Sequence, residues 1–203
     1  MAGEWSNEWL YYQASRIVSG CAALVLLAVA RNFLLADPRA PVQRERRSLV
    51  ATGTMLLFFV GHYELIHHRL GLLPIGPRAL AVGLTAVGLV LVVVGAVVNL
   101  LGRLSLAGNW SNQAVVYESQ DLVTSGVYGY VRHPLYASLI WMFCGAALAF
   151  HNGAALLATL LVFLPAMHYR ARLEEGLLAQ RFPDYAAYSA RTRRFLPWPR
   201  RAR

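Results

Sequence analysis

The residues best suited to chemistry in this sequence form two polar clusters, each next to a long apolar run. The first is the segment Ser125–Tyr136, in which Arg132 and His133 come directly before a proline. The second is the segment Arg170–Glu175, at the end of a later apolar run. Charged side chains are costly beside a bilayer and are usually kept there for binding or catalysis. We therefore expect the functional site at these two clusters.

The first cluster combines a helix start that suits an anion with aromatic faces that suit a cation. Pro134 fits the first turn of a helix, where its missing N–H has no partner to lose. The remaining N–H groups of that turn attract a carboxylate. Tyr128 and Tyr136 supply aromatic faces, which attract a cation such as a sulfonium. The alternative is a proline-capped helix with an interfacial belt of Arg, His and Tyr.

The second cluster places opposite charges on one helix face, because Arg170 and Glu174 are four residues apart. Arg170 has the planar donors that hold a carboxylate through two parallel hydrogen bonds. Glu174 is suited to ribose hydroxyls or to an amine. The alternative is an ordinary salt bridge at a membrane boundary.

The elements that must position these clusters are membrane helices. The chain has 203 residues, of which 57% are hydrophobic and 14% charged, whereas soluble domains carry about a quarter charged residues. The net charge is +9 and every basic residue other than histidine is arginine. Because the arginines lie beside apolar runs, they favour anionic lipid headgroups and a topology signal over nucleic acid.

The fold predicted is all-α: a polytopic membrane protein with five transmembrane helices and further C-terminal helices in the cytoplasm. The first three apolar segments are long enough to cross a bilayer, and the last two form a short hairpin. The arginine distribution places the N-terminus outside and both clusters on the cytoplasmic side of a bacterial-type inner membrane. We treat residues 1–203 as one domain, with three N-terminal helices in 1–101 and the cofactor-binding catalytic core in 102–203. The five segments are Ala14–Ala36, Ser48–His67, Ala79–Leu101, Pro134–Phe150 and Gly153–Tyr169.

Three further groups of residues have an ordinary interpretation as well as a functional one. Glu64 and His68 share a helix face, which suggests a metal, but with His62 and His67 they are better read as interfacial polar residues. Asn99, at the end of the third helix, and Arg103, Trp110 and Asn112, which follow it, are candidates to line the cytoplasmic site. The tail is expected to form short helices over Glu174–Phe182 and Tyr185–Arg194.

The order of motifs from Trp110 to Trp198 resembles that of the isoprenylcysteine carboxyl methyltransferase family of integral membrane enzymes. The resemblance rests on the polar loop, the Arg-His-Pro motif, the Arg-Glu-Glu motif and a tyrosine pair in the tail. It covers nearly half of the chain. The matching segments are Leu122–Tyr128, Arg132–Tyr136, Arg170–Glu175 and Phe182–Tyr188, followed by Arg193 and Pro197.

This resemblance implies S-adenosylmethionine as methyl donor, with S-adenosylhomocysteine as product, and a lipophilic small-molecule or lipidated acceptor among membrane lipids. Arg170 falls where the family places an arginine at the substrate carboxylate, so it is the expected catalytic and substrate-binding residue. The family often has a histidine near position 120 or 121, where this chain has Gln120 and Asp121. The expected cofactor-binding residues are Gln113, Gln120, Asp121, Leu122, Val123, Tyr128, His133, Pro134, Leu135, Tyr136 and Glu174.

Carboxyl O-methylation of an isoprenylcysteine-like acceptor is the leading functional hypothesis, because Arg170 suits a carboxylate. Phospholipid N-methylation and thiol S-methylation are alternatives within the same reaction class. An NADPH-dependent enzyme similar to sterol reductases, and a membrane scaffold without activity, are alternatives from other classes.

Overall fold

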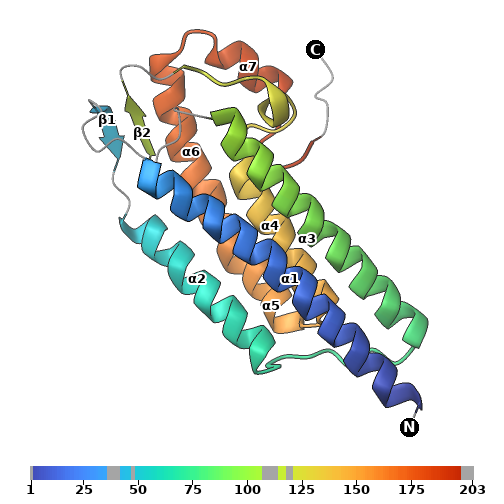
Figure 1. Cartoon of the computed structure of the whole chain (residues 1–203). Coiled ribbons are helices and arrows are strands. Elements are labelled where there is room, and N and C mark those ends of the chain that lie inside the picture. The colour runs from blue at the N-terminus through green and yellow to red at the C-terminus, as the bar shows by residue number, and fades with distance from the viewer. Residues whose placement is uncertain (1, 36–41, 47–48, 107–113, 118–120, 198–203) are drawn as a thin grey trace.

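Long helices make up most of the protein in the computed structural model, which describes residues 2–35, 42–46, 49–106, 114–117 and 121–197. The long helices lie side by side as a bundle, and the connections gather at its two ends (Figure 1). The helices are α1 (Ala2–Leu35), α2 (Leu49–His67), α3 (Arg78–Leu106), α4 (Pro134–Ala149), α5 (Gly153–Ala158), α6 (Leu164–Arg181) and α7 (Tyr185–Arg191), with η2 (Gly126–Gly129) and η3 (Thr159–Phe163) between them.

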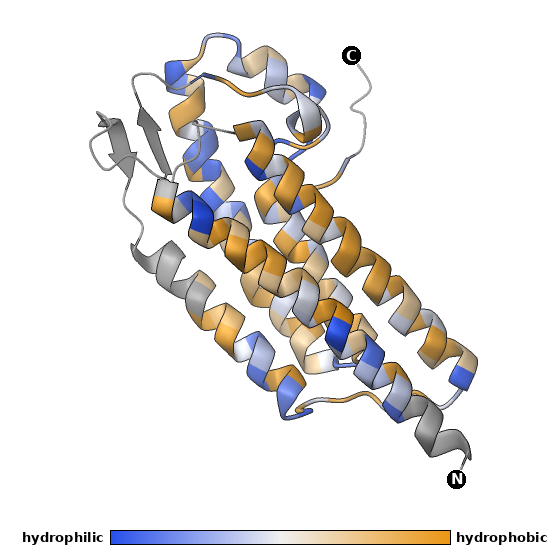
Figure 2. Ribbon diagram, in the orientation of Figure 1, coloured by the Kyte–Doolittle hydropathy of each residue, from blue (hydrophilic) through white to orange (hydrophobic). Residues whose placement is uncertain are grey.

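The bundle has the construction of an integral membrane protein. Within the described residues, three helical segments are long and apolar enough to cross a membrane: Glu8–Asn32, Arg78–Leu106 and Gly153–Arg181. Apolar residues run along the helices (Figure 2), and many large ones point outward, such as Leu27 on α1 and Val90 on α3. An exposed apolar surface of this extent suits lipid rather than water. The predicted number of five crossings remains a prediction.

The predicted hairpin is present, but only its first helix is short. α4 has 16 residues, whereas α5, η3 and α6 follow one another without a break from Gly153 to Arg181, over 29 residues. The middle segment, Thr159–Phe163, is a π-helical turn, and Pro165 follows in the first turn of α6. A π turn absorbs a local change of register, so the helix continues past the proline. The helix predicted over Glu174–Phe182 is therefore the end of α6.

A small antiparallel sheet is the main difference from the all-α prediction. Strand β1 (Val42–Arg46) pairs with β2 (Ala114–Tyr117), and in the sequence α2 and α3 lie between the two strands. Its two strands lie between the predicted transmembrane segments, where only connections were expected. Pairing between strands so far apart in the sequence produces no periodic pattern within either segment. The apolar runs therefore did not predict it.

Close packing of α3 against α4 forms the centre of the bundle. A Cβ atom added at Gly88 would lie 2.4 Å from the carbonyl oxygen of Gly145, and one added at Gly145 would lie 2.6 Å from that of Gly88. Glycine at such a crossing lets two helix backbones approach closely, as is common in membrane bundles. The close approach packs α4 tightly against α3, on the helix that begins with Pro134.

The polar connections lie together at one end of the bundle, which we call the polar end: η2, the start of α4, the last turns of α6, and α7 (Figure 1). The short helix predicted over Tyr185–Arg194 is present as α7 and ends at Arg191. Both polar clusters of the sequence therefore lie at the same end of the molecule.

Candidate functional site

His133 lies between two carboxylates. It precedes the first residue of α4, and its Nδ1 is 3.5 Å from Oε2 of Glu174 while its Nε2 is 3.2 Å from Oε1 of Glu175. The ring is buried and stacks on that of Tyr136, with centroids 5.6 Å apart. The Arg-His-Pro motif and the Arg-Glu-Glu motif are thus joined through this one side chain.

The two carboxylates favour the protonated form of His133. Burial alone lowers the pKa of an imidazole, but the hydrogen bonds and negative charges of Glu174 and Glu175 outweigh it, so the pKa of His133 is raised above 6.5. The more the protonated form is favoured, the better His133 serves as a hydrogen-bond donor to both carboxylates and the less it can act as a general base.

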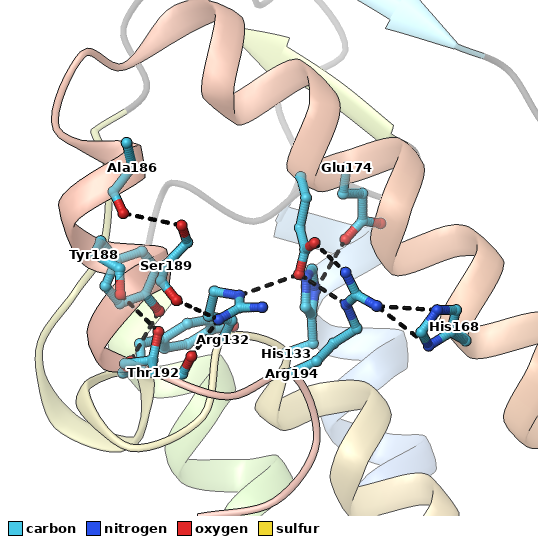
Figure 3. Close-up of polar contacts among 11 residues, drawn as sticks. Arg132, His133, His168, Glu174, Ala186, Tyr188, Ser189, Thr192 and Arg194 are labelled. Carbon is cyan, nitrogen blue, oxygen red and sulfur yellow. Dashed lines mark hydrogen bonds and ion pairs between the residues drawn. The ribbon is translucent and has the colours of Figure 1, made fainter. Parts of the chain in front are cut away.

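Glu175 accepts hydrogen bonds from two arginines as well. Arg132 Nε lies 3.1 Å and Arg194 Nε 2.9 Å from its Oε1, and a second Arg194 nitrogen reaches its Oε2. Figure 3 shows Arg132 and His133, from the segment before α4, and Arg194, from the tail, converging beside α6. We call these four residues the Glu175 cluster. Its charges are paired within the protein, which indicates a positioning role for Glu175.

The Glu175 cluster fastens the C-terminal segment across the start of α4. The Arg132 guanidinium donates to the carbonyl oxygens of Ser189 and Thr192. The backbone N–H of Arg132 donates to the carbonyl of Arg193 at 2.8 Å. In the sequence the tail arginines indicated topology and Arg193 belonged to the family motifs, but Arg194 was not predicted as a site residue. Its partner, Glu175, lies 19 residues earlier in α6, and no local spacing in the sequence predicts such a pair.

Glu174 joins the aromatic wall to Arg170. Its Oε1 accepts hydrogen bonds from the Tyr136 hydroxyl and from Arg170 Nε, the latter at 3.4 Å, while Oε2 faces His133. The predicted i,i+4 pair between Arg170 and Glu174 is therefore present. It is embedded among other polar groups, which distinguishes it from an isolated salt bridge at a membrane boundary.

Arg170 is buried where the polar end meets the apolar part of the bundle. It is 9% exposed, and one of its terminal nitrogens lies 3.4 Å from the sulfur of Met55 on α2. Its guanidinium carbon is 5.7 Å from the centre of the Tyr136 ring, within range of a cation–π contact. A guanidinium placed between a carboxylate, an aromatic face and a thioether lies at the boundary between polar and apolar surroundings.

Tyr128 connects the loop before α4 to α7. Its backbone carbonyl accepts a hydrogen bond of 2.8 Å from the Tyr188 hydroxyl. Burial raises the pKa of Tyr188 to about 12 and raises that of Tyr128 well above its usual value. Both phenols therefore stay neutral at physiological pH and act through hydrogen bonds and ring faces.

A chain of polar side chains supports the first turn of α4 from α3. Arg103 Nε donates to Asn99 Oδ1 at 2.9 Å, and Asn99 Nδ2 donates to Ser138 Oγ at 2.8 Å. Ser138 in turn donates to the carbonyl of Leu135 at 2.8 Å. Asn99 and Arg103 thus reach the region predicted for them, where Asn99 holds the helix start in place.

The structure brings together most of the predicted site. His133, Pro134, Tyr136, Arg170 and Glu174 form one contiguous group, and Leu135 and Tyr128 adjoin it. Leu122 and Val123 are half-buried and Asp121 is exposed. The described contacts do not include one between Leu122 or Val123 and this group. Trp110, Asn112, Gln113 and Gln120 lie outside the described residues.

The polar residues around the end of α2, for which a metal site was the less favoured interpretation, are separated in the structure. Glu64 and His68 make an exposed ion pair of 3.0 Å, while His62 is buried against aromatic rings. In the part of the chain that the structure describes, no group of three or more His, Cys, Asp or Glu side chains is placed to hold a metal ion. The interpretation as interfacial polar residues fits Glu64 and His68.

Residues 84–185 match the family model described as phospholipid methyltransferase, which covers half of the chain. The chain belongs to the phospholipid methyltransferase family. The match spans α3, α4 and α6 with both polar clusters, and it confirms the methyltransferase relationship that the motifs predict.

Individual relatives of this phospholipid methyltransferase family member match it over only part of their own length. The nickel-cobalt-cadmium resistance protein NccN of Alcaligenes xylosoxydans xylosoxydans is 37% identical over 83 residues, 39% of this chain and 38% of that protein. The cobalt-zinc-cadmium resistance protein CzcN of Cupriavidus metallidurans is 37% identical over 82 residues, 39% of this chain and 37% of that protein. The chain thus matches less than two fifths of these relatives.

A solved structure shows that the fold is shared with a membrane methyltransferase. The eukaryotic intramembrane Ras methyltransferase ICMT (isoprenylcysteine carboxyl methyltransferase) superposes with a TM-score of 0.54, at 20% identity, over 76% of this chain and 54% of that one. At this identity the likeness shows only that the phospholipid methyltransferase family member shares the fold. It does not identify the substrate.

Proposed function

We propose that this protein is an S-adenosylmethionine-dependent membrane methyltransferase that esterifies a carboxylate on a lipophilic acceptor, of which isoprenylcysteine is the model. The observation that carries the proposal is the position of Arg170, buried at the junction between the polar end and the apolar helices. A guanidinium there can hold a carboxylate while the apolar remainder of the acceptor stays in the membrane.

The residues at the polar end fit the proposed cofactor. The carboxylate of Glu174 and the face of Tyr136 suit the positive sulfonium, and the N–H groups at the start of α4 suit its carboxylate. A bound sulfonium supplies a methyl group that is already activated. The cofactor residues predicted from the motifs, including Tyr128, His133 and Glu174, keep this role in the proposal.

The protein's own contribution is then positioning. Arg170 orients the acceptor carboxylate toward the methyl group, and Glu174 orients Arg170 through the 3.4 Å contact. The Glu175 cluster fixes the C-terminal segment over His133. The surrounding apolar helices exclude water. Positioning of this kind contributes on the order of 7–11 kcal/mol to lowering a barrier.

Phospholipid N-methylation, which the family's name suggests, is the second candidate. A protonated amine must lose a proton before it attacks, so the site would need a general base. The carboxylates of Glu174 and Glu175 flank His133 and raise its pKa, which makes it a weaker base for this step, and Glu175 is paired with two arginines. This pairing favours an acceptor that is already anionic, such as a carboxylate.

Two measurements test the proposal on the full chain in detergent or nanodiscs. Calorimetric titration should show binding of S-adenosylhomocysteine and not of NADPH; the reverse result would contradict the methyltransferase assignment. Transfer of a labelled methyl group should then be compared across a prenylcysteine, phosphatidylethanolamine and a long-chain thiol. If phosphatidylethanolamine is labelled faster than the prenylcysteine carboxylate, the acceptor group is an amine and not a carboxylate.

We further propose that the polar end faces the cytoplasm, in line with the positive-inside rule.

A further inference from the structure

A group of basic side chains lies on an exposed face of α6, where the proposed reaction does not use it. His168 and Arg172 are four residues apart and both are exposed, so they share one face of the helix. Arg194 reaches this face from the tail, and one of its terminal nitrogens lies 3.2 Å from Nδ1 and 3.0 Å from Nε2 of His168. Figure 3 shows this contact on the side of Arg194 opposite to Arg132. We call His168, Arg172 and Arg194 the α6 basic site.

The position of Arg194 lets two guanidinium groups reach the same ligand. His168, Arg172 and Glu175 are at positions i, i+4 and i+7, which form one stripe along a helix. Arg194 contacts both ends of this stripe, because its other nitrogens pair with the carboxylate of Glu175. Arg172 lies in the turn between the two residues that Arg194 contacts. An anion over this turn would meet Arg172 and Arg194 together, with the ring of His168 beside them.

The α6 basic site carries more positive charge than its neighbours neutralise. Glu175 is paired with Arg132 as well as with Arg194, so one carboxylate faces two guanidinium groups. Among the residues that the structure describes, no acidic side chain is paired with Arg172. Neighbouring positive charges repel each other, and an anion bound between them removes the repulsion. Guanidinium groups hold phosphate oxygens through parallel hydrogen bonds, so the charge balance favours a phosphate.

The α6 basic site lies at the depth of lipid headgroups. The chain from Gly153 to Met167 has no charged residue and no histidine, and it belongs to a helical segment long and apolar enough to cross a membrane. His168 is thus the first ionisable side chain after the apolar run. Tyr169, the next residue, is 59% exposed, and tyrosines gather at the boundary between bilayer and water. The phosphate available at this depth is that of a membrane phospholipid.

We propose that the α6 basic site binds the phosphate of an anionic phospholipid. This lipid is not the methyl acceptor, because the site is exposed on α6 whereas Arg170 is buried. The proposal therefore does not rest on the proposed function. Since Arg194 also pairs with Glu175, the bound lipid adds support to the C-terminal segment that lies across the start of α4.

Native mass spectrometry of the full chain in detergent tests this site with two lipid probes, dioleoyl phosphatidylglycerol and dioleoyl phosphatidylcholine. The two lipids have the same acyl chains and differ in the net charge of the headgroup. We expect phosphatidylglycerol to bind at least about tenfold more tightly, which is the effect of two arginines at a membrane surface. Equal affinities for the two lipids would overturn the proposal.

Variants separate the α6 basic site from a general effect of positive charge. Arg172→Gln should weaken phosphatidylglycerol binding about fivefold and leave phosphatidylcholine binding unchanged. His168→Gln should act in the same direction and serves if Arg172→Gln does not fold. Arg191→Gln is the matched control, because it removes the same charge from an exposed position on α7 and should leave the preference intact. An equal loss in Arg172→Gln and Arg191→Gln would contradict a site at α6.

Inorganic phosphate distinguishes a lipid headgroup from a free anion. Added in large excess, it should leave phosphatidylglycerol bound, because the acyl chains hold the lipid against the apolar helices. Complete displacement would assign the site to free phosphate and overturn the lipid proposal.

Thermal unfolding provides a second measurement that does not depend on methyl transfer. A ligand that binds only the folded state stabilises it, so phosphatidylglycerol should raise the melting temperature of the wild type more than phosphatidylcholine does. The difference should shrink in Arg172→Gln and persist in Arg191→Gln. An unchanged difference in Arg172→Gln would contradict the proposal, whereas failure of every methyl-transfer assay would contradict only the proposed function.

Discussion

The Nε2 atom of His133 lies 3.2 Å from Oε1 of Glu175, although the two residues are 42 apart in the sequence. The same carboxylate receives Arg132 from the segment before α4 and Arg194 from the tail. One side chain of α6 therefore holds together three segments at the polar end. The predictions below follow from this arrangement and from the packing beneath it.

The stability of the protein should fall as the pH rises through the pKa of His133. Glu174 and Glu175 raise that pKa above 6.5 in the folded state, and Arg132, Arg194 and Tyr136 are the other groups facing the cluster. A raised folded pKa gives stability that is complete below about pH 6.5 and is lost at higher pH. Melting temperatures between about pH 6 and pH 9 test this. In His133→Gln the slope should be smaller; an equal slope would contradict the assignment.

Glu175→Gln should destabilise the protein by roughly 3 kcal/mol, because it leaves two largely buried arginines without their carboxylate. The side chains of Arg132, Glu175 and Arg194 are 8%, 15% and 23% exposed. Thermal unfolding in detergent measures the change. Glu64→Gln is the matched control, since its pair with His68 is exposed and should contribute little. Equal effects of the two variants would show that the Glu175 cluster is not structural.

Arg170→Ala should abolish methyl transfer and spare cofactor binding, because Arg170 is assigned to the acceptor carboxylate. Arg170→Lys keeps the charge but loses the planar pair of donors. We expect kcat/KM of Arg170→Lys to fall by about 10–100-fold, which corresponds to one or two charged hydrogen bonds. Calorimetry with S-adenosylhomocysteine and a labelled methyl assay separate the two effects. Full activity of Arg170→Ala would remove this residue from the mechanism.

Glu174→Ala should remove cofactor binding, the reverse of the pattern expected for Arg170. Its carboxylate contacts Tyr136, His133 and Arg170 together, so the alanine variant also releases the aromatic wall. Glu174→Gln keeps the size and one acceptor oxygen and should bind S-adenosylhomocysteine weakly. Wild-type affinity in Glu174→Gln would indicate that the negative charge is not needed.

Gly88→Ala should destabilise the bundle by about 1–3 kcal/mol through overpacking. An added Cβ would lie 2.4 Å from the backbone oxygen of Gly145 and 2.5 Å from the backbone nitrogen of Ala149, and neither backbone can move freely. Gly83, on the same helix, has no neighbouring atom within 4 Å of an added Cβ. Gly83→Ala should therefore be neutral or stabilising by up to about 1 kcal/mol. Melting temperatures that fall equally in both variants would contradict the close crossing.

The sequence by itself determined the helical class, the apolar segments and the two clusters that form the site. Hydropathy is a local property, so the helix at Arg78–Leu106 and the start of α4 at Pro134 were predictable from runs and from proline chemistry. The pairing of Arg170 with Glu174 was predictable because helical spacing fixes it. The family motifs added the link between the two clusters.

Only the tertiary structure decided which distant side chains meet. The bond from Arg194 to Glu175, the strand pair of Val42–Arg46 with Ala114–Tyr117, and the place of His62 beside Phe143 depend on how helices pack. The crossing at Gly88 and Gly145 sets that packing, and it acts through backbone approach, which a single sequence does not reveal. The residue types thus set the chemistry available at the polar end, and packing decided which charges are paired there.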